Sequence, residues 1–241
     1  MFLKKAIATT ALLTSMGGGV AYASLDTSDF IGSLRPYAGV DLQRRHMGME
    51  QAFGGNIWDR NFNQLDLFGG VRFLEYFGLN AGYEFTERKV RNNVLNVGDT
   101  RLGSVLTAGD GILSERGKNK INAWHVDFMG FLPICPRYHV ELLGSVGLAR
   151  AHLKMQEIIY AQNGILANNP VVRNYSEKRT LARASLGVQT IMFDHLGVRL
   201  SGTWEDTSRF KNLKPIENRS ATTLAKVQDS IIYGLGIFYI Y

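Results

Sequence analysis

The chain has 241 residues, 26 glycines, 11% aromatic residues and a formal net charge of +6 at pH 7. One cysteine, Cys135, excludes both an intramolecular disulfide and a cysteine-based metal cluster. A mean hydropathy of -0.07 suits a chain that alternates polar and apolar residues. Beyond the N-terminus no segment approaches the roughly 20 apolar residues of a transmembrane helix, so helical membrane insertion is excluded.

The N-terminus has the three parts of a secretory signal peptide. Lys4 and Lys5 form a basic region, residues 6–16 are largely apolar, and Ala21-Tyr22-Ala23 is a small-x-small cleavage site. We expect cleavage after Ala23, which removes residues 1–23 and leaves 24–34 as a short periplasmic segment. Without the two basic residues, 25 basic and 21 acidic residues remain, a net charge of +4. That excess does not indicate nucleic-acid binding.

Alternation of apolar and polar residues predicts eight strands along the chain. They cover residues 35–46, 62–73, 77–86, 121–132, 138–152, 179–193, 196–205 and 231–241. The third strand alternates most cleanly. In the last strand the apolar and aromatic residues share one face, whereas Gly234 and Gly236 fall on the other. Such a strand suits lipid on one side and a narrow interior on the other.

The connections between these strands alternate in length. Short ones lie near 74–77, 133–137 and 193–196, and long ones cover 47–61, 87–120, 153–178 and 206–229. An even number of strands allows the sheet to close, so that no edge faces lipid. The predicted fold is all-β, an eight-stranded antiparallel up-and-down transmembrane β-barrel over 35–241, with short periplasmic turns and long extracellular loops in a Gram-negative outer membrane.

The aromatic residues give an independent indication of a membrane barrel, since such rings collect at the two water interfaces. The threaded strands place one group at the periplasmic end: Phe73, Tyr76, Phe77, Tyr138, Phe193 and Tyr241. They place a second group at the outer end: Tyr83, Phe85, Trp124, Trp204 and Tyr233. A soluble lipocalin-type barrel would have the reverse polarity, with its apolar residues inside.

Three segments resemble a known family of outer-membrane proteins. The segment 67–85, LFGGVRFLEYFGLNAGYEF, is similar to the second-to-third-strand hairpin of the outer membrane protein A and opacity-type barrels, and 184–204 and the C-terminal strand are similar too. The resemblance implies the transmembrane domain alone, because no peptidoglycan-binding domain follows Tyr241. It also implies an interior network of salt bridges, in which we expect Glu84 to pair with Arg199.

The inward face of the predicted strands carries ionisable residues. They are Asp41, Asp66, Arg72, Glu84, His125, Asp127, Glu141, Arg183, Arg199 and Glu205. The interior of an eight-stranded barrel is only wide enough for side chains to fill, so we expect these groups to pair across the lumen and fix the register. The alternative is that they gate a narrow, low-conductance path.

We also considered catalysis at His125 and Asp127, which lie two residues apart on one strand face, with Ser145 as a cross-strand partner. A satisfied interior histidine is the favoured interpretation, so we predict no enzyme activity and no cofactor. The remaining histidines, His46, His139, His152 and His195, lack metal-ligand spacing.

The predicted function is structural and surface-interacting. The loops at 87–120 and 206–229 are net basic and would lie beside lipopolysaccharide or a host surface. The alternatives are a narrow porin and an adhesin. We expect the outward residues of the last strand to be the assembly signal that the barrel assembly machinery recognises: Tyr233, Leu235, Ile237, Tyr239 and Tyr241.

Overall fold

The structure, a computed structural model, describes residues 34–51, 58–98, 100–101, 104–105, 113–161, 171–210 and 225–241. The predicted signal peptide, with Ala21 and Ala23, lies outside the described residues and stays a prediction, as does nearly all of the predicted segment 24–34. Among the described residues, no helix is long and apolar enough to cross a membrane.

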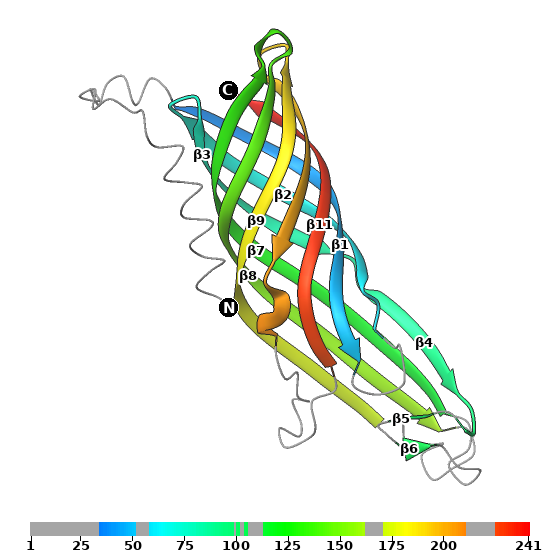
Figure 1. Cartoon of the computed structure of the whole chain (residues 1–241). Coiled ribbons are helices and arrows are strands. Elements are labelled where there is room, and N and C mark those ends of the chain that lie inside the picture. The colour runs from blue at the N-terminus through cyan, green and yellow to red at the C-terminus, as the bar shows by residue number, and fades with distance from the viewer. Residues whose placement is uncertain are drawn as a thin grey trace. The chain divides into compact units, whose positions relative to one another are not determined.

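Antiparallel strands form almost the whole described chain (Figure 1). The strands are β1 (Arg35–Gln51), β2 (Asn61–Phe73), β3 (Phe77–Thr86), β4 (Lys89–Leu95), β5 (Thr100–Arg101), β6 (Ser104–Val105), β7 (Leu113–Cys135), β8 (Val140–Ala161), β9 (Val171–Met192), β10 (Leu196–Glu205) and β11 (Ala225–Ile240). Two short 3-10 helices, η1 (Pro136–Tyr138) and η2 (Thr207–Arg209), complete the described elements.

In the described part of the chain, eight of these strands close into a ring. The order is β3-β2-β1-β11-β10-β9-β8-β7, and β7 pairs back with β3. The first and last strands meet from Tyr37↔Ile240 to Met47↔Ser230 and on to Gln51↔Ala225. Since each strand has a partner on both sides, the backbone groups are satisfied without water. The predicted eight-stranded antiparallel barrel is confirmed.

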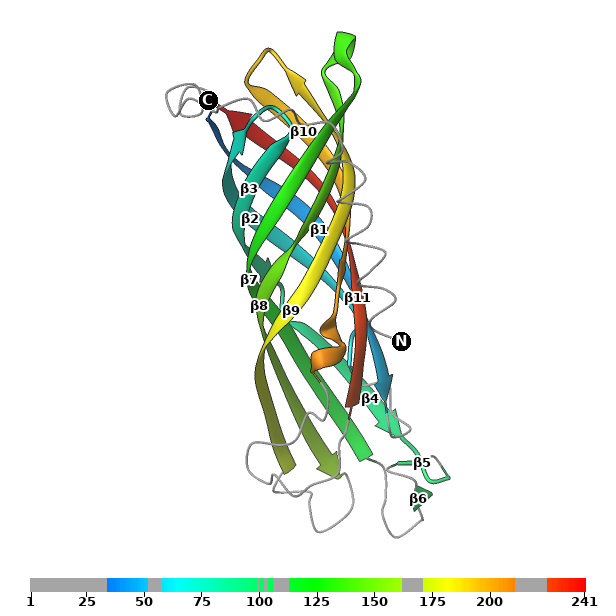
Figure 2. The ribbon, with the colours of Figure 1, turned by 60° about the vertical axis from the view of Figure 1, so that its left-hand side comes forward.

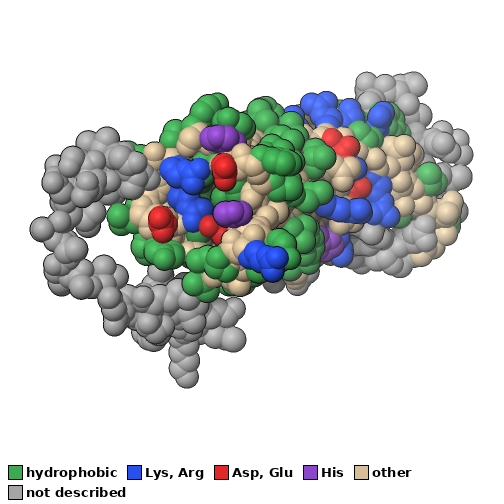
Figure 3. Space-filling model, turned by 90° about the horizontal axis from the view of Figure 1, so that it is seen from above, with side chains coloured by type: hydrophobic (Ala, Val, Ile, Leu, Met, Phe, Trp, Pro, Cys, Tyr) green, Lys and Arg blue, Asp and Glu red, His purple; other side chains and the backbone are tan. Residues whose placement is uncertain are grey.

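The outer surface of the ring is apolar, which explains why it needs a membrane. Large side chains such as Leu42, Leu186 and Val126 are 69%, 69% and 59% exposed. Hydrophobic side chains form a band between two groups of charged ones in Figure 3. A continuous apolar surface of this size is stable in lipid and not in water, so the barrel spans a membrane.

The predicted aromatic groups lie on this outer surface at its two ends. Phe77 stacks on Phe128 with ring centroids 5.8 Å apart, near the short turns. Tyr83 contacts Phe85 and Trp124 with centroids 4.4 Å apart in both cases, nearer the other end. We call the end with the short turns the turn end and the opposite one the loop end; by the usual orientation of such barrels the turn end faces the periplasm.

The strands run further at the loop end than the sequence analysis predicted. β7, β8 and β9 have 23, 22 and 22 residues, about twice the length that crosses a membrane. β4 pairs with β7 from Lys89↔Asn119 to Leu95↔Leu113, which adds a fourth strand to the extension. Large parts of the predicted loops 87–120 and 153–178 therefore belong to a four-stranded sheet that projects beyond the barrel (Figures 1 and 2).

Candidate functional site

The lumen of the barrel is filled by side chains in three layers. Seven buried hydrophobic residues form a turn-end layer: Tyr37, Phe68, Met129, Phe131, Leu143, Phe238 and Ile240. A larger buried cluster forms a loop-end layer: Met47, Met49, Trp58, Phe62, Ile121, Ala123, Ala149, Ala151, Leu153, Met155, Tyr175, Leu181, Phe210 and Val227. Most of the ionisable residues on the inward face of the strands lie in the register positions between these clusters and form a charged layer, whereas Arg72 and Glu141 lie beyond Phe68 and Leu143 at the turn end.

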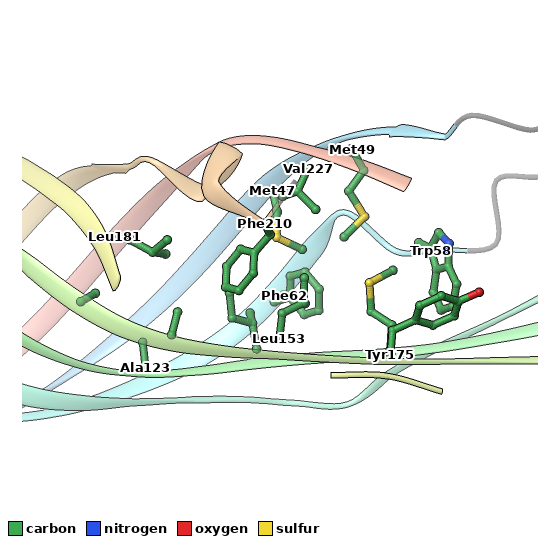
Figure 4. Packing of buried hydrophobic residues seen from close by; sticks show 14 residues of the cluster. Met47, Met49, Trp58, Phe62, Ala123, Leu153, Tyr175, Leu181, Phe210 and Val227 are labelled. Atoms are coloured by element: carbon green, nitrogen blue, oxygen red, sulfur yellow. The ribbon is translucent and has the colours of Figure 1, made fainter. Parts of the chain in front are cut away.

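The loop-end layer is a packed core (Figure 4). Phe62, Leu153 and Phe210 are each 0% exposed, and the ring of Phe210 enters the cluster from the segment directly after η2. Trp58 meets Tyr175 edge to face with ring centroids 6.2 Å apart. Side chains from β1, β2, β7, β8, β9 and β11 therefore fill this end of the lumen, which the sequence analysis had assigned largely to loops.

Arg45 lies at the centre of the charged layer. Its guanidinium donates to Glu84 Oε2 at 2.5 Å, to Glu205 Oε2 at 2.6 Å and to Gln64 Oε1 at 3.0 Å. Arg183 approaches from β9 and donates to Glu84 Oε1 at 2.9 Å. Glu84 therefore lies between two arginines, and all of these charged side chains are buried.

Two further ion pairs lie closer to the turn end. Arg199 donates to Asp41, with Nη2 2.5 Å from Oδ2, and its guanidinium lies 3.6 Å from the centroid of the Phe68 ring. Arg72 donates to both carboxylate oxygens of Glu141 at 2.7 and 2.9 Å. The predicted pair between Glu84 and Arg199 is wrong, because each has another partner. Cross-lumen neighbours depend on the tilt and stagger of the strands, which alternation does not reveal.

His125 bridges two carboxylates, and Ser145 does not lie beside it. Its Nε2 lies 3.0 Å from Asp66 Oδ1 and its Nδ1 lies 2.7 Å from Asp127 Oδ2. Ser145 pairs with Met129, whereas His125 pairs with Ala149, so Ser145 lies about 13 Å along the strand from the histidine. In a protonated ring both nitrogens would donate to these carboxylates, which is a structural arrangement rather than a catalytic one.

The same region contains the described group best placed for a metal ion. Ligand atoms of Asp66, Glu84 and His125 lie within 4.8 Å of one another. However, both oxygens of Glu84 accept hydrogen bonds from arginines, and His125 is engaged on both ring nitrogens. A cation would have to displace these partners, so the arrangement fits an ion-pair network better than a metal centre.

Ten ionisable residues were predicted to lie in the interior, and Arg45 was not among them. All ten side chains are buried or half-buried, with Arg72 the most accessible. Arg45 follows Asp41 and Gln43 on the same face of β1. The alternation of residues along this strand was therefore sufficient to predict that Arg45 points inward. With Arg45 included, this set has six carboxylates against four guanidinium groups and His125.

Two glycines on the inward face, Gly236 and Gly147, lack the side chains that would otherwise fill the space of the Asp41 and Asp127 carboxylates. A Cβ at Gly236 would lie 1.6 Å from Asp41 Oδ1, and one at Gly147 would lie 2.2 Å from Asp127 Oδ1. The position of the Asp41–Arg199 pair therefore requires a residue without a side chain on β11.

Replacement of Gly236 by alanine is expected to lower the free energy of unfolding by about 1 to 3 kcal/mol, because the new methyl group displaces Asp41 from Arg199. Urea unfolding of the refolded protein in phospholipid vesicles measures the change. Gly202→Ala is the matched control on neighbouring β10, where no atom lies within 4 Å of the added Cβ. Equal losses in the two variants would contradict the steric explanation.

Four of the predicted assembly residues lie on the outer face of β11, and Tyr241 directly follows that strand. Tyr233, Leu235, Ile237, Tyr239 and Tyr241 are 62%, 56%, 54%, 45% and 69% exposed. Tyr239 also stacks on His195 with ring centroids 5.4 Å apart, and the backbone N–H of Tyr241 donates to Pro36 O at 2.9 Å. Their recognition by the assembly machinery stays a prediction.

Comparisons with known proteins indicate the fold. No family model matches the chain, and no curated protein matches it. A similar solved structure is Ail, the attachment invasion locus protein of Yersinia pestis, in complex with the heparin analogue sucrose octasulfate, with 12% identity, a TM-score of 0.42 and coverage of 86% of this chain and 99% of that chain.

Two other bacterial surface proteins have comparable similarity. Neisserial surface protein A has 7% identity and a TM-score of 0.46 over 87% of this chain and 97% of that chain. OprG from Pseudomonas aeruginosa has 10% identity and a TM-score of 0.48 over 86% of this chain and 95% of that chain. The chain is thus similar in overall fold to outer-membrane β-barrel proteins.

Proposed function

We propose that this barrel has a structural and surface-interaction role and does not conduct solutes. The observation that carries the proposal is the filling of the lumen on both sides of the charged layer. Met47, Phe62 and Leu181 are 0% exposed on the loop side. Phe68, Phe131 and Phe238 are 5 to 6% exposed on the turn side.

These two apolar layers count against the alternative of a narrow channel. An ion that reached the charged layer would have to pass buried hydrophobic side chains on either side of it. The buried polar groups beside them, such as Arg72 with Glu141 and Asn119 with the Asp59 carbonyl, already have partners and are not free to replace a hydration shell. The arginines of the charged layer are also held by carboxylates, as Arg45 is by Glu84 and Glu205. Such pairs support a register-fixing role in place of a gate.

Planar-bilayer recording tests the proposal. We expect the purified, refolded mature protein to give no stable current above the bilayer background, whereas a sixteen-stranded porin in the same bilayers provides the positive control. Insertion is verified separately by heat-modifiable migration of the recovered protein. Stable, ion-selective conductance from the inserted protein would overturn the structural role and favour the porin alternative.

Adhesion is a second candidate, which the projecting sheet favours. β4, β7, β8 and β9 carry paired backbone well beyond the membrane belt, as in Leu113↔Ala161, and thus offer a firm surface to a partner. Leu95 pairs with Leu113 across the end of this sheet. Replacement of residues 96–112 by an Asn-Gly turn would keep the sheet and remove its tip.

Binding of cells that express this shortened protein to host cells or matrix tests the adhesin. We expect heat-modifiable folding to persist and binding to be lost if the tip is the adhesive element. Binding that persists at the level of the unaltered protein would exclude the tip from that role.

The aromatic end of β11 supports recognition by the barrel assembly machinery. Replacement of Tyr241 by aspartate is expected to reduce the amount of folded protein in the outer membrane severalfold, while export to the periplasm continues because the predicted export signal lies at residues 1–23. Fractionation with immunoblotting measures both. Tyr160→Asp is the control, because it changes an exposed tyrosine far from the C-terminus. An equal reduction of folded protein in the outer membrane for the two variants would contradict a specific signal at Tyr241.

A further inference from the structure

The outward side of the projecting sheet carries cations and no acid. Outward residues of β7 between 114 and 124, of β8 between 150 and 160 and of β9 between 172 and 180 include neither Asp nor Glu. Seven basic side chains are among them. Arg116 lies nearest the far end of the sheet, and the other six make up what we call the basic face: Lys118, Lys120, Arg150, His152, Lys154 and Lys178. Within the described residues, none of the six has a carboxylate partner.

Strand pairing brings these side chains together from positions far apart in the sequence. Lys120 lies opposite Lys154, and His152 lies opposite Lys178. Adjacent strands are about 4.8 Å apart, and alternate residues on a strand about 6.8 Å, so the basic face covers an area of roughly 10 by 20 Å. Like charges placed directly opposite each other destabilise a sheet. This arrangement therefore favours an anion that neutralises it.

The state of His152 is consistent with this concentration of charge. Partial burial, together with the charges of Lys154 and Lys178, lowers the pKa of His152 from its ordinary value. Its Nε2 lies 2.8 Å from Ser176 Oγ. Arg150 is held in turn by a hydrogen bond from its Nη1 to Thr180 Oγ1 at 3.0 Å, so two side chains of the basic face have fixed positions.

The basic face adjoins the apolar belt on the same strands. Trp124 lies opposite Arg150 and is 65% exposed, and Val126 lies opposite Leu148, each 59% exposed. A ligand that covers both surfaces must have anionic groups and apolar chains in one molecule. Lipids of the surrounding leaflet meet this requirement, whereas a soluble polyanion would leave the apolar part uncovered.

The opposite side of the barrel differs at the same level. On β10, Trp204 donates from Nε1 to Asp229 Oδ2 at 3.1 Å, and it lies opposite Ile231 of β11. An acid thus occupies the outward surface there. Among the described residues, the outward surface at this level thus carries an acid on β11 and a cluster of cations on β7, β8 and β9.

We propose that the basic face binds the phosphate groups of an anionic lipid in the outer leaflet, whose acyl chains lie against Trp124, Val126 and Leu148. Arg150 has the planar guanidinium that suits a phosphate, and the lysines supply compact charges around it. The inference rests on the proposed surface role and gives it a ligand. The anionic surface would hold the projecting sheet in a defined orientation on the membrane.

Quenching of single tryptophans by brominated lipids tests this site. The chain has three tryptophans, so Trp58→Phe with Trp204→Phe leaves only Trp124 beside the basic face. Trp58→Phe with Trp124→Phe leaves only Trp204 as the matched control on the other side. Each full-length mature protein is refolded into phosphatidylcholine vesicles that contain an equal mole fraction of brominated phosphatidic acid or brominated phosphatidylcholine.

We expect the relative binding constant at Trp124 to be about fivefold higher for phosphatidic acid than for phosphatidylcholine. This is the factor that corresponds to about 1 kcal/mol, the contribution of one Lys or Arg near an anionic lipid surface. Trp204 should show no preference. The double substitution Lys120→Glu with Lys154→Glu should abolish the preference at Trp124, and 0.5 M salt should weaken it. Ten millimolar inorganic phosphate should leave it intact, because a lipid source is proposed.

An equal preference for phosphatidic acid over phosphatidylcholine at Trp124 and Trp204 would overturn the site. Loss of the preference at Trp124 in the presence of inorganic phosphate would overturn it too. The comparison of the two tryptophans leaves the basic face unaltered, so misfolding of the charge-reversed protein cannot decide the outcome. The result is also separate from the proposed function: current across a bilayer would overturn the closed barrel without removing the lipid preference, and lost preference would leave the barrel closed.

Discussion

Replacement of Arg45 by alanine is expected to lower the free energy of unfolding by about 3 to 5 kcal/mol. Arg45 is 1% exposed and donates to Glu84 and Glu205 at 2.5 and 2.6 Å. Its removal leaves Glu205, which is 0% exposed, with Arg183 as its remaining cationic neighbour, at 3.3 Å. Urea unfolding in phospholipid vesicles, followed by heat-modifiable migration, measures the loss.

Arg44→Ala is the matched control for this substitution. Arg44 is the preceding residue on β1, has the same charge and lies on the exposed outer face, so its loss should change stability by less than about 0.5 kcal/mol. Adding Glu205→Gln to Arg45→Ala should recover part of the stability, because one of the two carboxylates then loses its charge. Equal effects at the two arginines would show that the charged layer does not contribute to stability.

Replacement of Phe62 by alanine is expected to cost about 3 to 5 kcal/mol, the range for deleting a large buried aromatic side chain. Phe62 is 0% exposed within the loop-end layer. The loss occurs only if this end of the lumen is a packed core, since a ring in a hydrated vestibule would cost little. The same unfolding assay in vesicles provides the measurement.

Phe85→Ala is the comparison on the neighbouring strand. Phe85 is 43% exposed on the outer face, and its ring meets Tyr83 with centroids 4.4 Å apart. Its removal should cost about 1 kcal/mol, mainly from that ring contact. If Phe62→Ala lowers the free energy of unfolding by no more than Phe85→Ala, the loop-end layer is not a packed core. The lumen would then not be closed at its loop end.

Alternation along the chain could predict which face of each strand meets lipid, because the two faces of a strand meet different solvents. It placed Asp41, Glu84 and Arg199 inside, and the same alternation along β1 also places Arg45 inside. It could not predict their partners. Arg199 meets Asp41 and not Glu84, because closure of a tilted sheet shifts each strand along its neighbours, and this stagger involves all eight strands at once.

The reach of the strands beyond the membrane could have been predicted in part. Leu153, Met155 and Ile159 continue the apolar inner face of β8, with Lys154 and Gln156 on the outer face. The pattern was missed because the expected membrane thickness set the strand length. The basic face was missed for another reason: Lys120, Lys154 and Lys178 lie more than twenty residues apart and become neighbours only through pairing of β7, β8 and β9.

The pairing of β1 with β11 makes the chain topologically a loop with one gap at the turn end. Tyr37 pairs with Ile240, and the N–H of Tyr241 reaches Pro36 O at 2.9 Å. The seam joins residues that are about as distant in sequence as the barrel allows. A short peptide that joins Tyr241 to the start of β1 would close this gap. New chain ends could then be introduced in the turns at 74–76 or 193–195. In such a circularly permuted barrel other strands would form the seam, while every contact in the lumen stayed the same.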